Sequence, residues 1–365
     1  MARFADIFLD VTKDGHKIPK ENYLPQGKYP IIDQGQEYIA GYSDESAGLY
    51  KDVPAIIFGD HTRIIKYVDT PCFLGADGVK LLKAKDTDAN YKYLYYALSH
   101  ARIPNTGYNR HFKWLKEVDI RLPNKNEQQC IVKILDKLSD LISLRKQQLA
   151  KLDELVKARF VEMFGDCLTN PKGWRTQRLE EIAEVGSSKR VFVEELQEKG
   201  IPFYRGTEIG ALAEGRQITP ELFITEKHYA ELCEATGAPR IGDLLMPSIC
   251  PDGRIWVVNT DEPFYFKDGR VLWVHAIDSS YDPVFLLYTL KDRIMTDYNS
   301  IASGTTFSEL KIFALKKCRI FDVPIMLQNE FSAFVKQIDK SKLTIQQSLD
   351  KLEVLKKSLM QEYFG

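Results

Sequence analysis

The sequence contains no long apolar run and no sign of an export signal. No window approaches the roughly 18 uninterrupted apolar residues that a membrane-spanning helix requires. The N-terminal stretch MARFADIFLDVTKDG carries acidic residues and lacks the apolar core of a signal peptide. We therefore expect a soluble protein of the cytoplasm.

Cysteine is sparse and scattered, which argues against two common ways of holding a domain together. None of the six cysteines forms a CxxC pair, and none has a histidine at the spacing of metal ligands. We expect reduced thiols that pack in the interior, with neither a zinc module nor a disulfide framework. The six are Cys72, Cys130, Cys167, Cys233, Cys250 and Cys318.

An excess of either charge is also lacking. The chain has 50 basic and 51 acidic side chains and a net charge of −1. Proteins that bind nucleic acid alone are often basic, so this balance weighs mildly against DNA binding by the isolated chain. The positions of the charges matter more than their sum, however. With 365 residues, of which 44% are apolar, the chain can build two or three domains with real cores.

Signatures of catalysis are missing as well. The sequence has no HExxH, no P-loop, no nucleophile elbow and no glycine-rich cofactor turn after a strand. One weak alternative is a PD…ExK nuclease, in which Asp252 and Glu309 would hold Mg²⁺ beside Lys311. Because an acid-x-Lys triplet often arises by chance, the sequence favours a chain that is not an enzyme.

What the chain does have is an internal repeat. The segment KLDELVKARFVEMFG, residues 151–165, matches KLEVLKKSLMQEYFG, residues 351–365, without a gap at an offset of 200. Fainter matches precede it: YKYLYYALSH from Tyr91 resembles PVFLLYTLKD from Pro283. The chain is therefore a tandem duplication.

Each copy of the strongest match ends a long stretch without proline or glycine, and a glycine follows it. This pattern predicts two long helices, from about Glu127 and from about Asn329, each reaching roughly 55 Å at ~1.5 Å per residue. Apolar residues recur at sevens, which predicts that the two helices pack as an antiparallel coiled coil within the chain. Because Arg145 and Lys342 interrupt the seams, a larger bundle with a partner stays open. The predicted seam residues are Leu135, Leu138, Ile142, Leu149, Leu152, Val156, Met163, Ile338, Ile345, Leu349, Leu352 and Leu359.

The order of the segments predicts an α+β fold with two similar globular units joined by the two helices. Each globular part holds short β-like runs, such as PAIIFGD and DLLMPS, and one amphipathic helix. We expect globular domains at residues 1–122 and 166–322 and helical segments at 123–165 and 323–365, related by a pseudo-twofold repeat.

Two heads on rigid helices suit a target with two sites at a set spacing, such as DNA, whose helical turn is about 34 Å. The chain resembles the specificity subunit of type I restriction–modification systems. The resemblance covers the whole chain and rests on LPNKNEQQCIVKILDKL from Leu122, the helix endings EMFG and EYFG, WRTQRLEEIAEV, and SGTTFSEL. The chain enters the second helix through VPIMLQNEFSAFV, which begins at Val323. This stretch lacks the PxxEQ-like signature found at 123–128.

This resemblance implies a division of labour. The heads would be target recognition domains, each reading one half of a bipartite DNA site, and the helices would be conserved spacers. The chain would perform no chemistry and hold no cofactor. It would dock two methyltransferase subunits that use S-adenosylmethionine to methylate adenine, and ATP-dependent motor and nuclease (restriction) subunits would complete the enzyme. The alternative is a two-headed scaffold or adaptor without DNA specificity.

A head that reads bases needs side chains that reach groove edges and others that bind phosphates. Candidates in the first head are His61, Thr62, Arg63, Lys66, Tyr108, Asn109, Arg110, His111 and Lys113. Candidates in the second head are Ser187, Ser188, Lys189, Arg190, Arg205, Arg254, Ser303, Thr305, Thr306 and Ser308. Plain solvated surface is the alternative for each. We expect Gly107 and Gly304 to be turn glycines, and Tyr108 and Trp114 to pack rather than to stack on bases.

Overall fold

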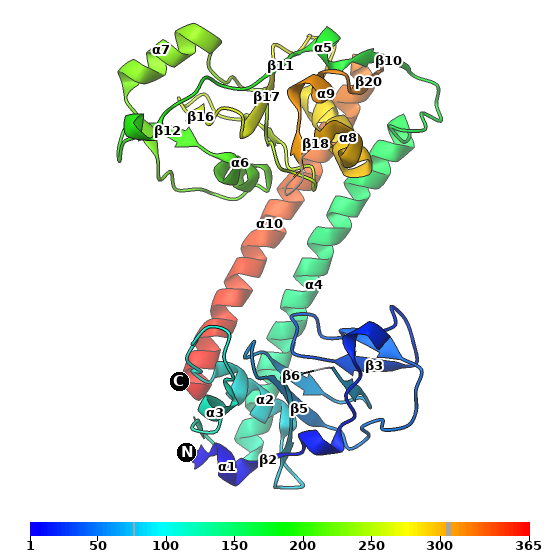
Figure 1. The fold of residues 1–365 in the computed structure, drawn as a ribbon, viewed down its shortest axis with the longest axis vertical. Coiled ribbons are helices and arrows are strands. Elements are labelled where there is room, and N and C mark those ends of the chain that lie inside the picture. The colour runs from blue at the N-terminus through cyan, green and yellow to red at the C-terminus, as the bar shows by residue number, and fades with distance from the viewer. Residues whose placement is uncertain (76, 304–307) are drawn as a thin grey trace. The chain divides into compact units, whose positions relative to one another are not determined.

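The computed structural model describes residues 1–75, 77–303 and 308–365 (Figure 1). The chain forms two compact units: the first comprises residues 1–148 and 345–365, and the second comprises residues 149–344. The first unit is thus built from two separate stretches of chain. Within the described residues, no helix is long and apolar enough to cross a membrane.

The first unit contains three small sheets. The largest is antiparallel, in the order β2 (Phe8–Asp10), β8 (Val79–Ala84), β5 (Ala55–Gly59), β6 (Ile65–Val68). The second has the order β4 (Gly41–Ser43), β3 (Tyr29–Ile32), β7 (Phe73–Leu74), and β3 runs parallel to β7. The third pairs β1 (Ala2–Arg3) with β9 (Asp119–Ile120). All five residues of β5 are buried, as expected for a strand covered on both faces.

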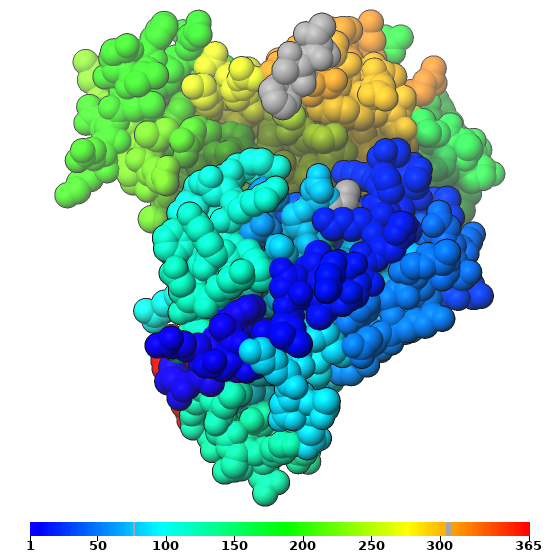
Figure 2. All heavy atoms as spheres, turned by 60° about the horizontal axis from the view of Figure 1, so that its bottom comes forward, coloured from blue at the N-terminus to red at the C-terminus, as the bar shows by residue number. Residues whose placement is uncertain are grey.

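Short helices complete this unit: α1 (Phe4–Ile7), η1 (Thr12–Asp14), η2 (Lys20–Asn22), α2 (Tyr91–His100) and α3 (Phe112–Leu115). Helix α2 begins after Asn90, whose side chain accepts a hydrogen bond from the backbone N–H of Tyr93. Its buried face, which includes Leu94, packs in one core with Phe58 of the central sheet. Figure 2 shows the face of this unit that the N-terminal segment crosses, drawn in dark blue.

The second unit repeats this topology. Its central sheet has the order β11 (Glu184–Gly186), β17 (Val271–His275), β14 (Leu244–Pro247), β15 (Trp256–Val257). Its second sheet has the order β13 (Phe223–Ile224), β12 (Ile201–Tyr204), β16 (Tyr265–Phe266), and β12 runs parallel to β16. Its third pairs β10 (Arg175–Arg178) with β20 (Arg319–Asp322). This unit adds the pair β18 (Ala302–Ser303) and β19 (Glu309–Leu310).

The helices of the second unit are α5 (Leu179–Ile182), η3 (Val193–Glu195), α6 (Gly206–Ala213), α7 (Glu226–Thr236), α8 (Pro283–Ile301) and α9 (Ile312–Lys316). Helix α8 corresponds to α2, because both follow the central sheet in sequence and both are capped by a side chain. Its cap is Asp282, which accepts from the backbone N–H groups of Val284 and Phe285. Within the described residues, α6 and α7 have no counterpart in the first unit, so the expectation of one amphipathic helix in each globular part is wrong for the second.

The two long helices confirm the predicted architecture. Helices α4 (Lys125–Phe164) and α10 (Ile325–Phe364) each contain 40 residues. They pair antiparallel within each unit: Lys146 contacts Glu353 at 2.8 Å in the first, and Arg159 contacts Glu330 at 2.8 Å in the second. Lys342, which interrupts the predicted seam, is accommodated by an ion pair with Asp153 across the helix pair.

None of the predicted seam residues is exposed. The buried ones are Leu135, Leu138, Val156, Ile338 and Leu349, and the half-buried ones are Ile142, Leu149, Leu152, Met163, Ile345, Leu352 and Leu359. A heptad count alone missed a cluster of aromatic rings at one end of the seam. Phe164 lies 4.8 Å from Phe285 and 5.6 Å from Phe331, centroid to centroid.

The starts of the long helices are alike in structure although the signature is lost in the second. The side-chain amide of Gln128 donates to the carbonyl of Pro123 at 2.8 Å. Gln328, 200 residues later, donates to the carbonyl of Val323 at 2.8 Å. A glutamine at this position therefore holds the connection to the helix in both copies.

Candidate nucleic-acid interface

The structure brings together the two loops of the first unit that the sequence singled out separately. Asp60, at the end of β5, is buried, and its carboxylate accepts the backbone N–H of Phe112 at 2.7 Å. Its backbone carbonyl accepts the N–H of His111 at 2.8 Å. The turn at 60–63 and the segment at 105–113 consequently form one surface.

Two aromatic side chains from these loops stack at that surface. The rings of His61 and Tyr108 are 4.8 Å apart and inclined by 9°, and Nδ1 of His61 lies 3.2 Å from the carbonyl oxygen of Asn109. Tyr108, which the sequence predicts to be a packing aromatic, packs on the ring of His61 and is 89% exposed. It is held against another loop instead of a core. Trp114, in contrast, is half-buried, as expected for a packing aromatic.

A third loop, at residues 33–38, joins the same surface and was not singled out from the sequence. The side-chain oxygen of Gln34 accepts the backbone N–H of His61 at 3.1 Å, and its carbonyl accepts the hydroxyl of Thr62 at 2.7 Å. Gln36 in this loop is exposed. Nothing in the local sequence marks these amides, because the sheet pairing that places them is long-range.

The tight turn itself is shaped by Arg63. This residue has a φ of 63°, and its backbone N–H donates to the carbonyl of Gly59 at 2.7 Å. Its guanidinium donates to the carbonyl of Ile103 at 3.2 Å, which leaves the remaining donors available. Arg63 is half-buried, whereas Arg110 is fully on the surface.

Two of the candidates lie in the interior. His111 is 0% exposed, and its ring contacts the carbonyl of Asp60 at 3.0 Å. Lys66 is buried beside Asp33 at 3.7 Å; burial lowers the pKa of Lys66, and Asp33 acts in the opposite direction. Because both side chains are buried, neither belongs to the DNA interface that we propose. The remaining candidates of this unit are His61, Thr62, Arg63, Tyr108, Asn109, Arg110 and Lys113.

The second unit makes the equivalent junction. The backbone N–H of Leu310 donates to the carbonyl of Ser248 at 2.7 Å, which joins the turn after β14 to the segment before α9. Arg254 lies in that turn and is half-buried, with Asp252 at 2.8 Å and Glu214 at 3.7 Å. Ser303 is exposed and Ser308 is half-buried. Thr305 and Thr306, like Gly304, lie outside the described residues.

The segment Ser187–Arg190 approaches this junction through Arg270. The hydroxyl of Ser187 donates to the carbonyl of Val271 at 2.6 Å, and the carbonyl of Arg270 accepts the N–H of Ser248 at 2.9 Å. Arg270, which the sequence reading missed, is exposed and pairs with Glu309. The hydroxyl of Ser188 also donates a hydrogen bond within the unit, to the carbonyl of Phe266 at 2.6 Å. Lys189 and Arg190 remain exposed.

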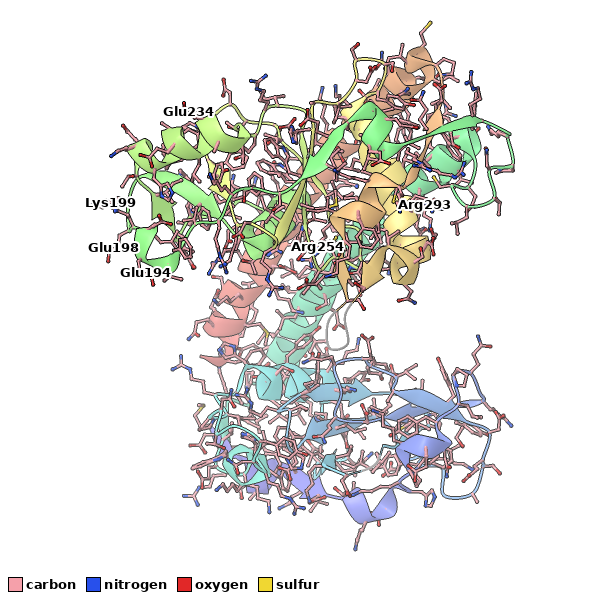
Figure 3. The ribbon with its side chains drawn as sticks, turned by 45° about the horizontal axis from the view of Figure 1, so that its top comes forward. Glu194, Glu198, Lys199, Glu234, Arg254 and Arg293 are labelled. Carbon is pink, nitrogen blue, oxygen red and sulfur yellow. The ribbon has the colours of Figure 1, made fainter. Side chains whose placement is uncertain are left out.

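Arg205 is held by acidic side chains. Its guanidinium contacts Glu208 at 2.6 Å and Glu221 at 3.0 Å. Further acids gather at the outer end of this unit. Glu194, Glu198 and Glu234 lie there together with Lys199, away from Arg254 and Arg293 (Figure 3). Because DNA is an anion, the end of the unit that carries Arg254 is the better candidate for contact with it.

The acids of the nuclease alternative are engaged by cations. Asp252 binds Arg254, and Glu309 binds Arg270 and lies 3.5 Å from Lys311. No three histidine, cysteine, aspartate or glutamate side chains gather as a metal site would require, as far as the structure describes the chain.

Comparison with known proteins identifies the class. The family described as the type I restriction modification DNA specificity domain matches the chain twice, over residues 3–154 and 171–356. The chain therefore belongs to this family, which agrees with the resemblance noted in its sequence.

Several individual relatives are specificity subunits. The type I restriction enzyme MjaIX specificity subunit of Methanocaldococcus jannaschii is 27% identical over 67% of this chain, and the match spans 60% of that subunit. A type I restriction enzyme specificity subunit of Haemophilus influenzae is 23% identical over 92% of this chain and 86% of its own length. The EcoR124I/EcoR124II specificity subunit of Escherichia coli is 29% identical over 36% of this chain and 37% of its own length. All three are named for specificity, not for catalysis.

Solved structures show the same fold. The S subunit of a type I restriction–modification system from M. genitalium superimposes with a TM-score of 0.60 at 19% identity, covering 100% of this chain and 95% of that one. A chain from a structure concerned with complex assembly and conformational transition of the type I R-M system has a TM-score of 0.53 at 17% identity, with 100% and 95% covered. The predicted α+β fold with two long antiparallel helices is confirmed.

Proposed function

We propose that this chain reads a bipartite DNA site, with one half-site bound by residues 1–122 and the other by residues 166–322. Residues 123–165 and 323–365 serve as the helical spacers. The observation that carries the proposal is that both units contain the same kind of candidate site. The family matches each half of the chain, and each unit joins the turn after its central strand to the segment before a short helix.

Base reading in the first unit depends on exposed amide and guanidinium groups. Asn109 and Arg110 are both exposed beside the stacked His61 and Tyr108. An asparagine can pair with adenine and an arginine with guanine through two hydrogen bonds each. Lys113, also exposed, is suited to a phosphate. For the second unit we propose Ser303, which is exposed, and Arg254, which must exchange its ion pairs with Asp252 and Glu214 for contacts with DNA.

The reaction belongs to partner subunits. We propose that the chain, acting in the cytoplasm, docks two methyltransferase subunits that carry S-adenosylmethionine and methylate adenine, and that motor and nuclease subunits join them. Exposed apolar side chains on the long helices support a docked protein, because water disfavours such groups. They are Ile134, Leu141, Leu144, Val354 and Leu355 in the first unit and Leu155, Val161, Met326 and Leu343 in the second.

The near-zero net charge agrees with this division. With a net charge of −1, the isolated chain has no excess of cations to bind phosphates. We expect weak, strongly salt-dependent DNA binding by the chain alone and tight specific binding by the complex, in which the partner subunits supply further phosphate contacts.

The test is to map methylated bases across the genome of cells that express this chain with a methyltransferase subunit, against cells that lack the chain. A split motif with methyladenine in both halves, present only with this chain, is the expected result. If the methyltransferase is active with another specificity chain but adds no methylation with this one, the proposal fails. The adaptor alternative would then be favoured.

A further inference from the structure

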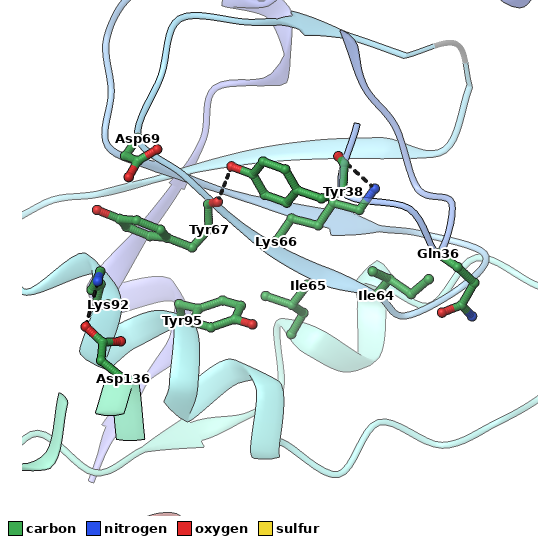
Figure 4. Close-up of a pocket in the computed structure, with 10 residues that line it drawn as sticks. All are labelled: Gln36, Tyr38, Ile64, Ile65, Lys66, Tyr67, Asp69, Lys92, Tyr95 and Asp136. Atoms are coloured by element: carbon green, nitrogen blue, oxygen red, sulfur yellow. Dashed lines mark hydrogen bonds and ion pairs between the residues drawn. The ribbon is translucent and has the colours of Figure 1, made fainter. Parts of the chain in front are cut away.

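A hollow of about 400 Å³ opens in the first unit beside the edge strand β6 (Figure 4). Tyr67 of β6 and Tyr95 of α2 line it, and Asp136 of α4 lies at one end. The hydroxyl of Tyr38 donates to the carbonyl of Tyr67 at 2.8 Å, which fixes one wall. The hollow thus spans the globular part of the unit and its long helix.

Among the described charged side chains around the hollow, one carboxylate has no ion-pair partner. Lys92 is neutralised by Asp136 at 2.6 Å, and Lys66 lies 3.7 Å from Asp33. Asp69 also lines the hollow; it is exposed and makes no ion pair or hydrogen bond within the described part of the chain. The unmatched charge of the hollow is therefore negative.

This chemistry disfavours DNA as the occupant. A phosphate would meet Asp69 while both lysines are engaged by carboxylates. Tyr67 and Tyr95 are tilted by 53°, with centroids 6.3 Å apart, so these two rings do not sandwich a flat base. Tyrosine faces beside a carboxylate are instead suited to a cation. Among cationic side chains, the planar guanidinium of arginine both stacks on rings and forks onto a carboxylate.

We propose that this hollow takes an arginine side chain of a docked methyltransferase subunit, with its guanidinium against the tyrosines and paired with Asp69. The inference rests on the proposed function and deepens it by assigning a contact to the partner. Because the lining includes α4, a subunit seated on the long helices can reach it without leaving the first unit.

The second unit does not offer the same lining. On the strand ladder, Tyr67 pairs with Ile56, and the equivalent pair is Val257 with Leu244. Tyr95 and Asp136 correspond in the sequence repeat to Leu287 and Lys336. The hydroxyls and the carboxylate are thus replaced by aliphatic groups and a cation. One of the two methyltransferase copies is consequently anchored more firmly than the other.

The test compares assembly of full-length variants with the methyltransferase subunit by native mass spectrometry across a titration. We expect Asp69→Lys to weaken one of the two bound copies on the order of ten-fold, so that a one-to-one complex accumulates. Asp69→Glu, which keeps the negative charge, should bind two methyltransferase subunits as tightly as the unaltered chain does. Asp261→Lys is the matched control, because Asp69-x-Pro71 recurs as Asp261-x-Pro263 in the second unit.

The outcomes separate this inference from the proposed function. Two copies that bind Asp69→Lys as tightly as the unaltered chain would overturn the inference alone. So would unchanged assembly with altered DNA affinity, since the hollow would then belong to DNA. If the unaltered chain binds no methyltransferase subunit, the proposed function fails and this inference fails with it. Asp69 is exposed and makes no ion pair or hydrogen bond with the residues that the structure describes, so the variants should remain folded.

Discussion

At the scale of residues, the candidate arginines differ in what already holds them. Arg110 is exposed and makes no ion pair or hydrogen bond among the residues that the structure describes. Arg205, in contrast, is engaged by Glu208 and Glu221. A guanidinium without partners can give all its donors to a base, whereas a paired one must first lose its carboxylates.

This difference predicts unequal effects on DNA recognition. Arg110→Ala should weaken specific binding by the assembled complex by about 1–3 kcal/mol and relax one half of the recognised motif. Arg205→Ala should leave both halves unchanged. Binding titrations on a panel of altered half-sites would check this. An equal loss on all sequences for Arg110→Ala would instead assign Arg110 to a phosphate.

Glu208 gives a prediction for pH. Burial alone would raise its pKa, but hydrogen bonds from Arg205 and Thr207 outweigh burial and lower the pKa of Glu208 to about 2. The charged carboxylate therefore stabilises the fold above its ordinary pKa of 4.5, and this stabilisation is lost as the pH falls towards 2. Glu208→Gln should lower the melting temperature at neutral pH, and the difference from the unaltered chain should shrink below pH 4.5. A difference that stays constant down to pH 3 would contradict the assignment.

At the scale of elements, the last residue of each long helix is an aromatic anchor. Phe164 ends α4 and is 0% exposed against α8. Phe364 ends α10 and lies 5.3 Å from Tyr93 of α2, but it is half-buried. The repeated FG ending thus attaches each long helix to a short helix of the globular part.

Removing these rings should destabilise the units unequally. Phe164→Ala should lower the free energy of unfolding of the second unit by about 3–5 kcal/mol, because it deletes a fully buried ring. Phe364→Ala should cost the first unit less. Val161→Ala, at a 41% exposed position of the same helix, is the control and should change little. Equal losses for all three, measured by denaturant unfolding, would refute the anchoring role.

At the scale of the whole molecule, the two units have the same topology but different loops. In the second unit α6 and α7 lie between β12 and β14, and the described residues of the first unit hold no equivalent helices. The common strands and long helices form a framework, and the loops are where the two units diverge. Because binding residues often lie on loops held by a rigid framework, each unit can read a different sequence.

Exchange of one unit should therefore change one half of the recognised motif. Replacing residues 166–322 with the corresponding segment of another family member should alter the second half-site and leave the first as it was. Methylation mapping of cells that carry the chimera would show this directly. Loss of both halves, with the chimera folded and assembled, would mean that the two units do not read independently.

The sequence by itself determined the duplication, the α+β class and the presence of two long helices, although these begin at Lys125 and Ile325, before the predicted starts near Glu127 and Asn329. Helical periodicity and the terminal glycines are local signals, and a repeat at an offset of 200 needs no structure to be seen. None of the residues predicted for the seam is exposed. Phe285 could not be found in this way because it belongs to α8, whereas Phe331 lies on the heptad row seven residues before Ile338 and was missed.

Only the tertiary structure decided which candidates share a surface. His111 and Lys66 lie inside, whereas Tyr108 is exposed, although all three stand in polar stretches of similar composition. Gln34 and Arg270 joined the candidate interfaces through long-range strand pairing. Burial and convergence depend on contacts between residues far apart in the chain, and such contacts leave no mark on the local sequence.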